Sequence, residues 1–170
     1  SIEKPRAVPQ SVILAATKMG MNVTLAHPEG YDLDPAVIDN CKRFAKETDG
    51  SFKITNNFDE GFKGAHIVYP KAWGAYTCFN YADENGKVYK EADHKEAKRV
   101  NELAKGWRTT HKQIALVDKH GVYMHCLPAD RGQEVDDDVI DGDRSIVIDE
   151  AENRLHAHKA IMALVMGGRL

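Results

Sequence analysis

The sequence lacks the features that mark a membrane-spanning or a nucleic-acid-binding protein. Its 170 residues contain no apolar run of the roughly 18 residues that a transmembrane helix needs. Acidic side chains (26) outnumber lysine and arginine (23), whereas a nucleic-acid-binding domain normally has a basic excess. We therefore expect neither a membrane nor a nucleic acid as a partner.

Cysteine is scarce, and its placement excludes a disulfide framework. The three cysteines, Cys41, Cys78 and Cys126, are an odd number at wide spacing and contain no Cys-x-x-Cys pair. No set of cysteines and histidines has the spacing of a zinc site, so no metal is expected. The first ten residues also lack the apolar segment of a signal peptide. Together these absences favour a reducing, cytoplasmic setting.

Two nucleotide-binding signatures are missing as well. Neither G-x-G-x-x-G nor G-x-x-x-x-G-K-[ST] occurs, which weakens a dinucleotide or P-loop interpretation, and no cofactor is predicted. The composition that remains, 42% apolar and 29% charged, suits one globular domain over residues 1–170 with a full core.

Apolar periodicity predicts alternating helices and strands. Gly20 is expected to end the first helix, and Asp34-Pro35 to cap the second. Expected strands cover residues 21–26, 52–55, 65–69, 122–125 and 145–148, and expected helices cover 8–19, 35–48, 58–62, 90–105, 110–117, 136–140 and 149–166. This order predicts a doubly wound, Rossmann-like α/β domain with a mainly parallel sheet of about five strands and helices on both faces.

The chain opens with a loop and a helix, whereas such domains usually open with a strand, so we expect it to be part of a longer protein. In open parallel sheets, ligands bind outside the carboxyl ends of the strands. The chemically rich segments His27–Gly30, Pro70–Tyr81 and Cys126–Glu134 follow expected strands and fall at that edge.

The segment His125-Cys126-Leu127-Pro128 is the strongest candidate for a site. Cys126 follows a strand, where its sulfur can face a ligand and where His125 can lower its pKa. The Leu127–Pro128 bond can be cis, which would turn the Leu127 carbonyl toward a cleft. The alternative from the pattern alone is an ordinary buried cysteine followed by a loop proline.

Arg154, in the first two turns of the last expected helix, is the second candidate. Its guanidinium can bind phosphate or carbonyl oxygens through two hydrogen bonds. The alternative is a surface arginine paired with Glu150, four residues earlier. Likewise, Trp73 and the aromatic residues after it either line a pocket or pack a long loop.

Taken together, HCLP in residues 125–128 and ENRLHAHKA in residues 152–160 resemble the carbamoyltransferase (transcarbamylase) family, specifically the second domain of the ornithine type. The resemblance covers nearly the whole chain. It implies that the carbamoyl phosphate-binding first domain is absent, that the full-length protein is a homotrimer and that this chain alone is inactive. It also implies that Cys126 and the Leu127 carbonyl, with His125 and Pro128 beside them, orient an acceptor amine, and that Arg154 stabilises the transition state.

Two departures resemble the knotted carbamoyltransferases, which include enzymes for N-acetylornithine and N-succinylornithine and a group of unassigned substrate. Residues 3–10 lack the asparagine-rich loop of ornithine enzymes, and Lys71 to Tyr76 replace their Asp-x-x-x-Ser-Met-Gly motif. Lys71 and Trp73 become candidate substrate-binding residues. Glu134 falls about where N-acetylornithine enzymes carry a modified, negatively charged lysine, so it is expected to supply a carboxylate.

The expected substrates are carbamoyl phosphate and an ornithine-like amino acid or derivative, and the expected products are a ureido compound and phosphate. Two alternatives stay open: a non-catalytic α/β domain that binds small molecules, and an ornithine carbamoyltransferase with an atypical specificity loop.

Overall fold

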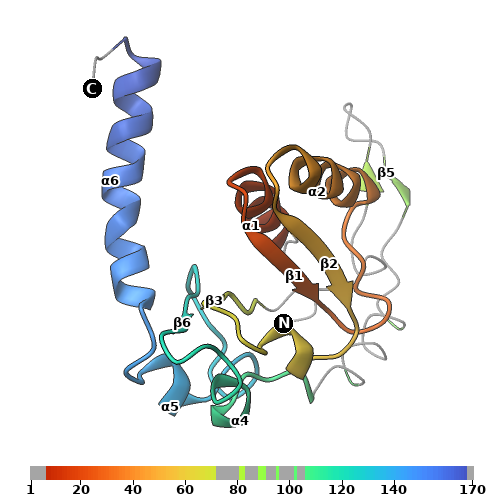
Figure 1. Cartoon of the computed structure of the whole chain (residues 1–170), viewed down its shortest axis with the longest axis vertical. Helices are drawn as coiled ribbons and strands as arrows, with labels where there is room; N and C mark the ends of the chain where they lie inside the picture. Colours follow the sequence, from red (N-terminus) through yellow and green to blue (C-terminus); the bar gives the residue numbers. More distant parts are fainter. Residues whose placement is uncertain are drawn as a thin grey trace. The chain divides into compact units, whose positions relative to one another are not determined.

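The computed structural model describes residues 7–71, 81–82, 88–90, 95, 102 and 106–167. These residues form two compact units. The first comprises the chain up to Lys63 together with Lys71–Arg108, and the second comprises Gly64–Pro70 together with the chain from Thr109 onward. Parallel strand pairs and helices make up both units (Figure 1), which confirms the α/β class. Within the described residues, hydrogen bonds join the strands in pairs rather than in one sheet of about five.

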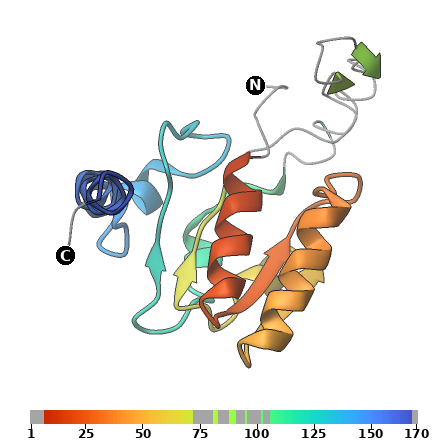
Figure 2. The same ribbon diagram turned by 90° about the horizontal axis from the view of Figure 1, so that it is seen from above.

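The first unit contains one complete β-α-β segment. Strands β1 (Asn22–Ala26) and β2 (Ser51–Thr55) pair in parallel, with Asn22 opposite Ser51 and Ala26 opposite Thr55. Helices α1 (Ala7–Lys18) and α2 (Pro35–Glu47) lie side by side against this pair (Figure 2). A short 3₁₀ helix, η1 (Asp59–Gly61), follows β2.

Local sequence signals explain where these helices begin and end. The Asp34 carboxylate accepts a hydrogen bond from the Ala36 amide at 2.8 Å, and Pro35 occupies the first turn, as predicted. Gly20 ends α1 with a φ of +78°, a conformation that glycine adopts without strain.

The core of this unit joins both helices to both strands. Its buried members are Ile13, Leu25, Leu33 and Cys41, and burial raises the pKa of the Cys41 thiol. Each fully buried aliphatic side chain contributes about 1.5–3 kcal/mol to folding.

The second unit is built on the parallel pair β3 (Ile67–Val68) and β6 (Val122–Tyr123). Helix α4 (His111–Ile114) begins with a capping box between Thr110 and Gln113, which explains why Thr110 marks its start. Helix α5 (Asp137–Ile140) and the long α6 (Val147–Val165) complete the unit.

The expected strand over residues 145–148 is wrong. Only Ser145 makes a strand-like bridge, to Tyr123, and α6 begins at Val147 rather than at Asp149. The apolar run Ile146-Val147-Ile148 has the composition of a buried strand, and a short apolar run does not distinguish strand from helix. Asp149 and Glu150 lie in the first helical turn, where negative charge is favourable.

The expected helix over residues 90–105 lies mostly outside the described residues. Strand β5 (Val88–Lys90) includes Lys90 and pairs antiparallel with β4 (Tyr81–Ala82), so a helix does not begin at Lys90.

Helix α6 carries apolar side chains that face solvent. Ile148, Leu155, Met162 and Met166, which share one side of a helical wheel, are each more than half exposed. Among the described residues, no helix has both the length and the hydropathy to cross a membrane.

Candidate active site

The candidate site is built where β3 and β6 end. Because these strands pair in parallel, with Val68 opposite Tyr123, the residues that follow them emerge at the same edge. The Met124 amide donates to the Val68 carbonyl at 3.0 Å, which extends the pairing to the last position before His125. Tyr69 and His125 therefore leave neighbouring strands together.

His125 is fully buried, and both of its ring nitrogens have partners. Nε2 lies 3.0 Å from Oε2 of Glu134, whose side chain is also buried, and Nδ1 accepts the Leu127 amide proton at 3.0 Å. Since Nδ1 is an acceptor, the proton is on Nε2, which donates to the carboxylate. The imidazole thus ties the start of the Cys126 loop to its end.

Glu134 closes this loop from inside. Besides His125, its Oε2 accepts the Asp130 amide proton at 3.0 Å, and the residue is only 5% exposed. This burial does not favour the expected role of Glu134 as a carboxylate facing substrate. Nor does the His125 ring bond to Cys126, because both of its nitrogens are occupied elsewhere.

The Cys126 loop itself has the geometry that its sequence allows. The Leu127–Pro128 peptide bond is cis, as anticipated, and Leu127 has a φ of +48°. Cys126 is a free cysteine of intermediate exposure, and Leu127 is 37% exposed. Cys126 and Leu127 are therefore both partly exposed to solvent.

Glu150 links the Cys126 loop to the first turn of α6. Its Oε2 accepts the His125 amide proton at 2.9 Å, and its Oε1 accepts the Tyr69 hydroxyl proton at 2.6 Å. Neither residue pair was predicted from the sequence. Because 81 residues separate Tyr69 from Glu150, no local pattern indicates their contact. The sequence shows only that Tyr69 ends an expected strand.

The Tyr69 side chain is partly buried and lies near the Glu150 carboxylate and the Cys126 thiol. Burial and the hydrogen bond to the Glu150 carboxylate raise the pKa of Tyr69 well above its usual value, and the nearby Cys126 adds to the rise. Tyr69 thus stays protonated and remains a hydrogen-bond donor at neutral pH. It interacts with both the Glu150 carboxylate on α6 and the Cys126 side chain on the loop.

Arg154 is exposed, one turn beyond Glu150 on α6. The structure shows no hydrogen bond or ion pair for its guanidinium among the described residues, and both oxygens of Glu150 are engaged by Tyr69 and His125. The alternative of a surface pair with Glu150 is therefore wrong. Among the described residues, the donors of the Arg154 guanidinium are left for another partner.

Arg131 fastens the outer part of the loop to α5. Its guanidinium makes a two-pronged ion pair with Asp141 at 2.6 and 2.7 Å and a further bond to Asp137 at 2.7 Å. The Arg131 hydrogen bonds lower the pKa of Asp141. All three side chains are well exposed, so this network contributes modestly to stability.

Lys71 and Trp73 were also predicted to bind substrate. Lys71 is partly exposed and belongs to the first unit, and Trp73 lies outside the described residues. Among the described residues, no group of three or more cysteine, histidine and acidic side chains has the arrangement of a metal site.

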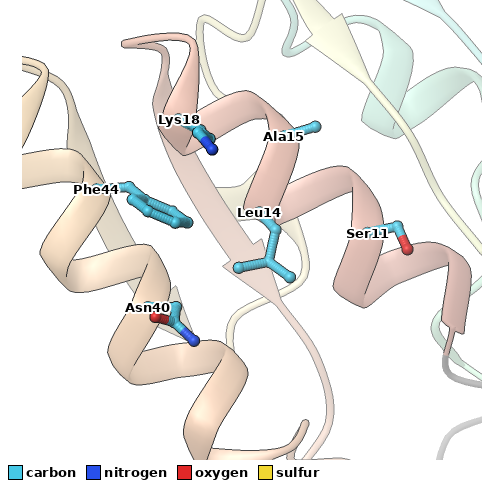
Figure 3. Close-up of a pocket in the computed structure, with 6 residues that line it drawn as sticks. All are labelled: Ser11, Leu14, Ala15, Lys18, Asn40 and Phe44. Atoms are coloured by element: carbon cyan, nitrogen blue, oxygen red, sulfur yellow. The ribbon is translucent and has the colours of Figure 1, made fainter. Parts of the chain in front are cut away.

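An open groove between α1 and α2 is distinct from the candidate site (Figure 3). It is lined by Ser11, Leu14, Ala15, Lys18, Asn40 and Phe44, all in the first unit. The centroid of the Phe44 ring lies 5.4 Å from Lys18 Nζ and 4.3 Å from the Arg43 guanidinium carbon. None of these residues was predicted to be functional.

Comparison with known proteins decides the family. Residues 4–165 match the family model of the aspartate/ornithine carbamoyltransferase Asp/Orn-binding domain. The chain belongs to this family. It is 42% identical over 162 residues to ornithine carbamoyltransferase of Thermococcus kodakarensis, covering 95% of this chain and 46% of the relative. It is also 42% identical over 138 residues to the putative carbamoyltransferase YgeW of Escherichia coli K12, covering 76% of this chain and 34% of that protein.

Solved structures agree. An N-acetyl-L-ornithine transcarbamylase aligns with a TM-score of 0.80 at 35% identity, over 92% of this chain and 44% of that one. An acetylornithine transcarbamylase complexed with acetylcitrulline aligns equally well, over 43% of its length. The chain therefore spans less than half the length of the relatives it matches. The resemblance to carbamoyltransferases deduced from HCLP and ENRLHAHKA is confirmed.

Proposed function

We propose that this chain is the amine-binding half of a carbamoyltransferase, which transfers the carbamoyl group of carbamoyl phosphate to the amino group of an ornithine-like amino acid or derivative. One observation carries the proposal. Glu150 accepts the His125 amide proton, so the HCLP motif is hydrogen-bonded to the first turn of α6, the helix that carries Arg154 one turn further on.

In the proposed reaction the deprotonated amine attacks the carbamoyl carbon. A C–N bond forms, the bond to the phosphate oxygen breaks, and phosphate leaves with the electron pair and takes up the proton that the amine nitrogen loses. Holding both substrates in one site makes the attack effectively intramolecular. The Cys126 sulfur and the Leu127 carbonyl accept hydrogen bonds from the amine and orient its lone pair, and Pro128 shapes the loop.

Arg154 is assigned to the charge that develops on the carbamoyl oxygen. Its guanidinium is exposed and has no partner among the described residues, which suits this role because no ion pair with them must break before it reaches the substrate. His125 and Glu134 act from inside the loop and keep its backbone in place.

The substrate's other end is assigned to the segment that begins at Lys71. Lys71 is proposed to bind a carboxylate or an acyl group, and Trp73 to line the pocket. Both ornithine and N-acetylornithine are candidate acceptors, because relatives named for each are similar to this chain. The full-length protein is proposed to be a cytoplasmic homotrimer, since carbamoyltransferase sites lie between subunits.

We expect the full-length enzyme, but not residues 1–170 alone, to convert carbamoyl phosphate and an acceptor into a ureido product. The reason is that the first domain, which anchors carbamoyl phosphate, is not part of this chain. The measurement is colorimetric detection of the ureido product with ornithine, N-acetylornithine, N-succinylornithine and small diamines. Product formation by residues 1–170 would refute the half-site, and activity with none of the acceptors would refute the assigned substrate class.

A further inference from the structure

The Tyr69–Glu150 contact joins parts of the chain that the proposed mechanism requires to be held together. Tyr69 leaves β3, His125 leaves β6, and Glu150 lies in the first turn of α6. Each Glu150 oxygen accepts from a different segment, at 2.6 Å from the Tyr69 hydroxyl and at 2.9 Å from the His125 amide. One carboxylate thus fixes three elements at a single point.

Helical geometry extends this constraint to Arg154. Residues four apart lie on the same face of a helix, so the face that presents Glu150 to the strand ends also carries Arg154. On the loop side, Glu150 holds the amide of His125, the residue immediately before Cys126. Any shift of the Glu150 carboxylate therefore changes the separation between the thiol and the guanidinium.

Tyr69 is suited to hold that carboxylate still. Burial and the bond to Glu150 raise the pKa of Tyr69, so its hydroxyl is a permanent donor at neutral pH. Without it, Oε1 of Glu150 would have no protein donor among the described contacts, and the carboxylate would be held only by the His125 amide. Its position at the amino end of α6 is electrostatically favourable but does not fix its orientation.

We propose that Tyr69 and Glu150 are a positioning pair that sets the alignment of Cys126 and Arg154 on the reacting groups. The proposal rests on the carbamoyltransferase function proposed above. Neither residue touches the substrates in this mechanism. Both act through the residues that do.

The test compares two tyrosines with the same chemical change in the full-length enzyme. Tyr69→Phe removes the hydroxyl that holds Glu150, whereas Tyr123→Phe removes a buried hydroxyl that has no hydrogen-bond partner among the described residues. We expect Tyr69→Phe to lower kcat about tenfold, equivalent to about 1.4 kcal/mol, with an unchanged KM for carbamoyl phosphate. Tyr123→Phe should retain wild-type kcat and be as stable as the wild type or more so.

A second pair of variants separates positioning from packing. Glu150→Gln keeps one carbonyl acceptor and an amide of the same shape, so its kcat should fall less than that of Glu150→Ala. If Tyr69 and Glu150 had a purely structural role, each variant would lose thermal stability in proportion to its loss of activity. The correctly folded fraction of each variant would then show a normal kcat per active site. If the wild type is active and Tyr69→Phe has a normal kcat, the positioning role of Tyr69 and Glu150 is overturned but the proposed function is not. A wild type inactive with every acceptor would overturn the proposed function.

Discussion

Replacing Arg154 with alanine in the full-length enzyme is expected to lower kcat about a hundredfold to a thousandfold. This is the loss typical of removing one group that stabilises developing oxyanion charge in a transition state. Arg154 is exposed and makes no hydrogen bond or ion pair among the described residues, so its removal should leave stability nearly unchanged. Steady-state turnover and thermal unfolding, measured on the same preparation, check both statements.

The matched control is Arg43→Ala, the same change at an exposed arginine on α2 that pairs with Glu47 at 2.9 Å. It should retain full turnover. Arg154→Lys keeps the charge but loses the two-pronged donor geometry, so it should recover only part of the activity. Normal turnover of Arg154→Ala would contradict the assigned role and favour the non-catalytic binding domain.

The second large effect is expected at the buried pair beneath the Cys126 loop. Glu134→Ala removes the acceptor of the His125 Nε2 proton, which is buried, and the carboxylate that accepts the Asp130 amide proton. Burying unpaired donors and losing a hydrogen bond to a charged group should cost about 3 kcal/mol of folding free energy. Activity should fall too, because the loop that carries Cys126 and Leu127 loses its internal tie.

A double-variant cycle isolates this pair. His125→Ala and Glu134→Ala should each destabilise strongly, and the double variant should cost clearly less than the sum of the two. His120→Ala, at an exposed histidine, is the control and should be neutral. If Glu134→Ala lost activity at wild-type stability, the carboxylate would face substrate, as its position in the sequence first indicated.

Local signals in the sequence were enough to predict the helix boundaries of the first unit. Asp34, Pro35 and Gly20 act on the backbone within a few residues of their own positions, so their effect does not depend on distant residues. The cis bond before Pro128 was anticipated for the same reason. Conversely, Ile146-Val147-Ile148 was assigned to a strand because composition alone does not reveal where a helix's first turn is stabilised by Asp149 and Glu150.

The candidate site shows the same division. Cys126 and Arg154 were identified because each lies in a motif that is one unbroken stretch of the sequence. The partners that hold them were missed, since Tyr69 and Glu150 meet only after β3 and β6 pair. Glu134 was assigned to the substrate, but the structure buries its carboxylate against His125, a consequence of the way the loop folds back on itself.

The most direct test is a crystal structure of the full-length enzyme with a bisubstrate analogue that joins the acceptor's amine nitrogen to a phosphonoacetyl group. We expect this nitrogen to lie within hydrogen-bond distance of the Cys126 sulfur and the Leu127 carbonyl. The Arg154 guanidinium should donate to the adjoining carbonyl oxygen. An analogue bound away from the Cys126 loop, or an Arg154 side chain pointing to solvent, would contradict this expectation.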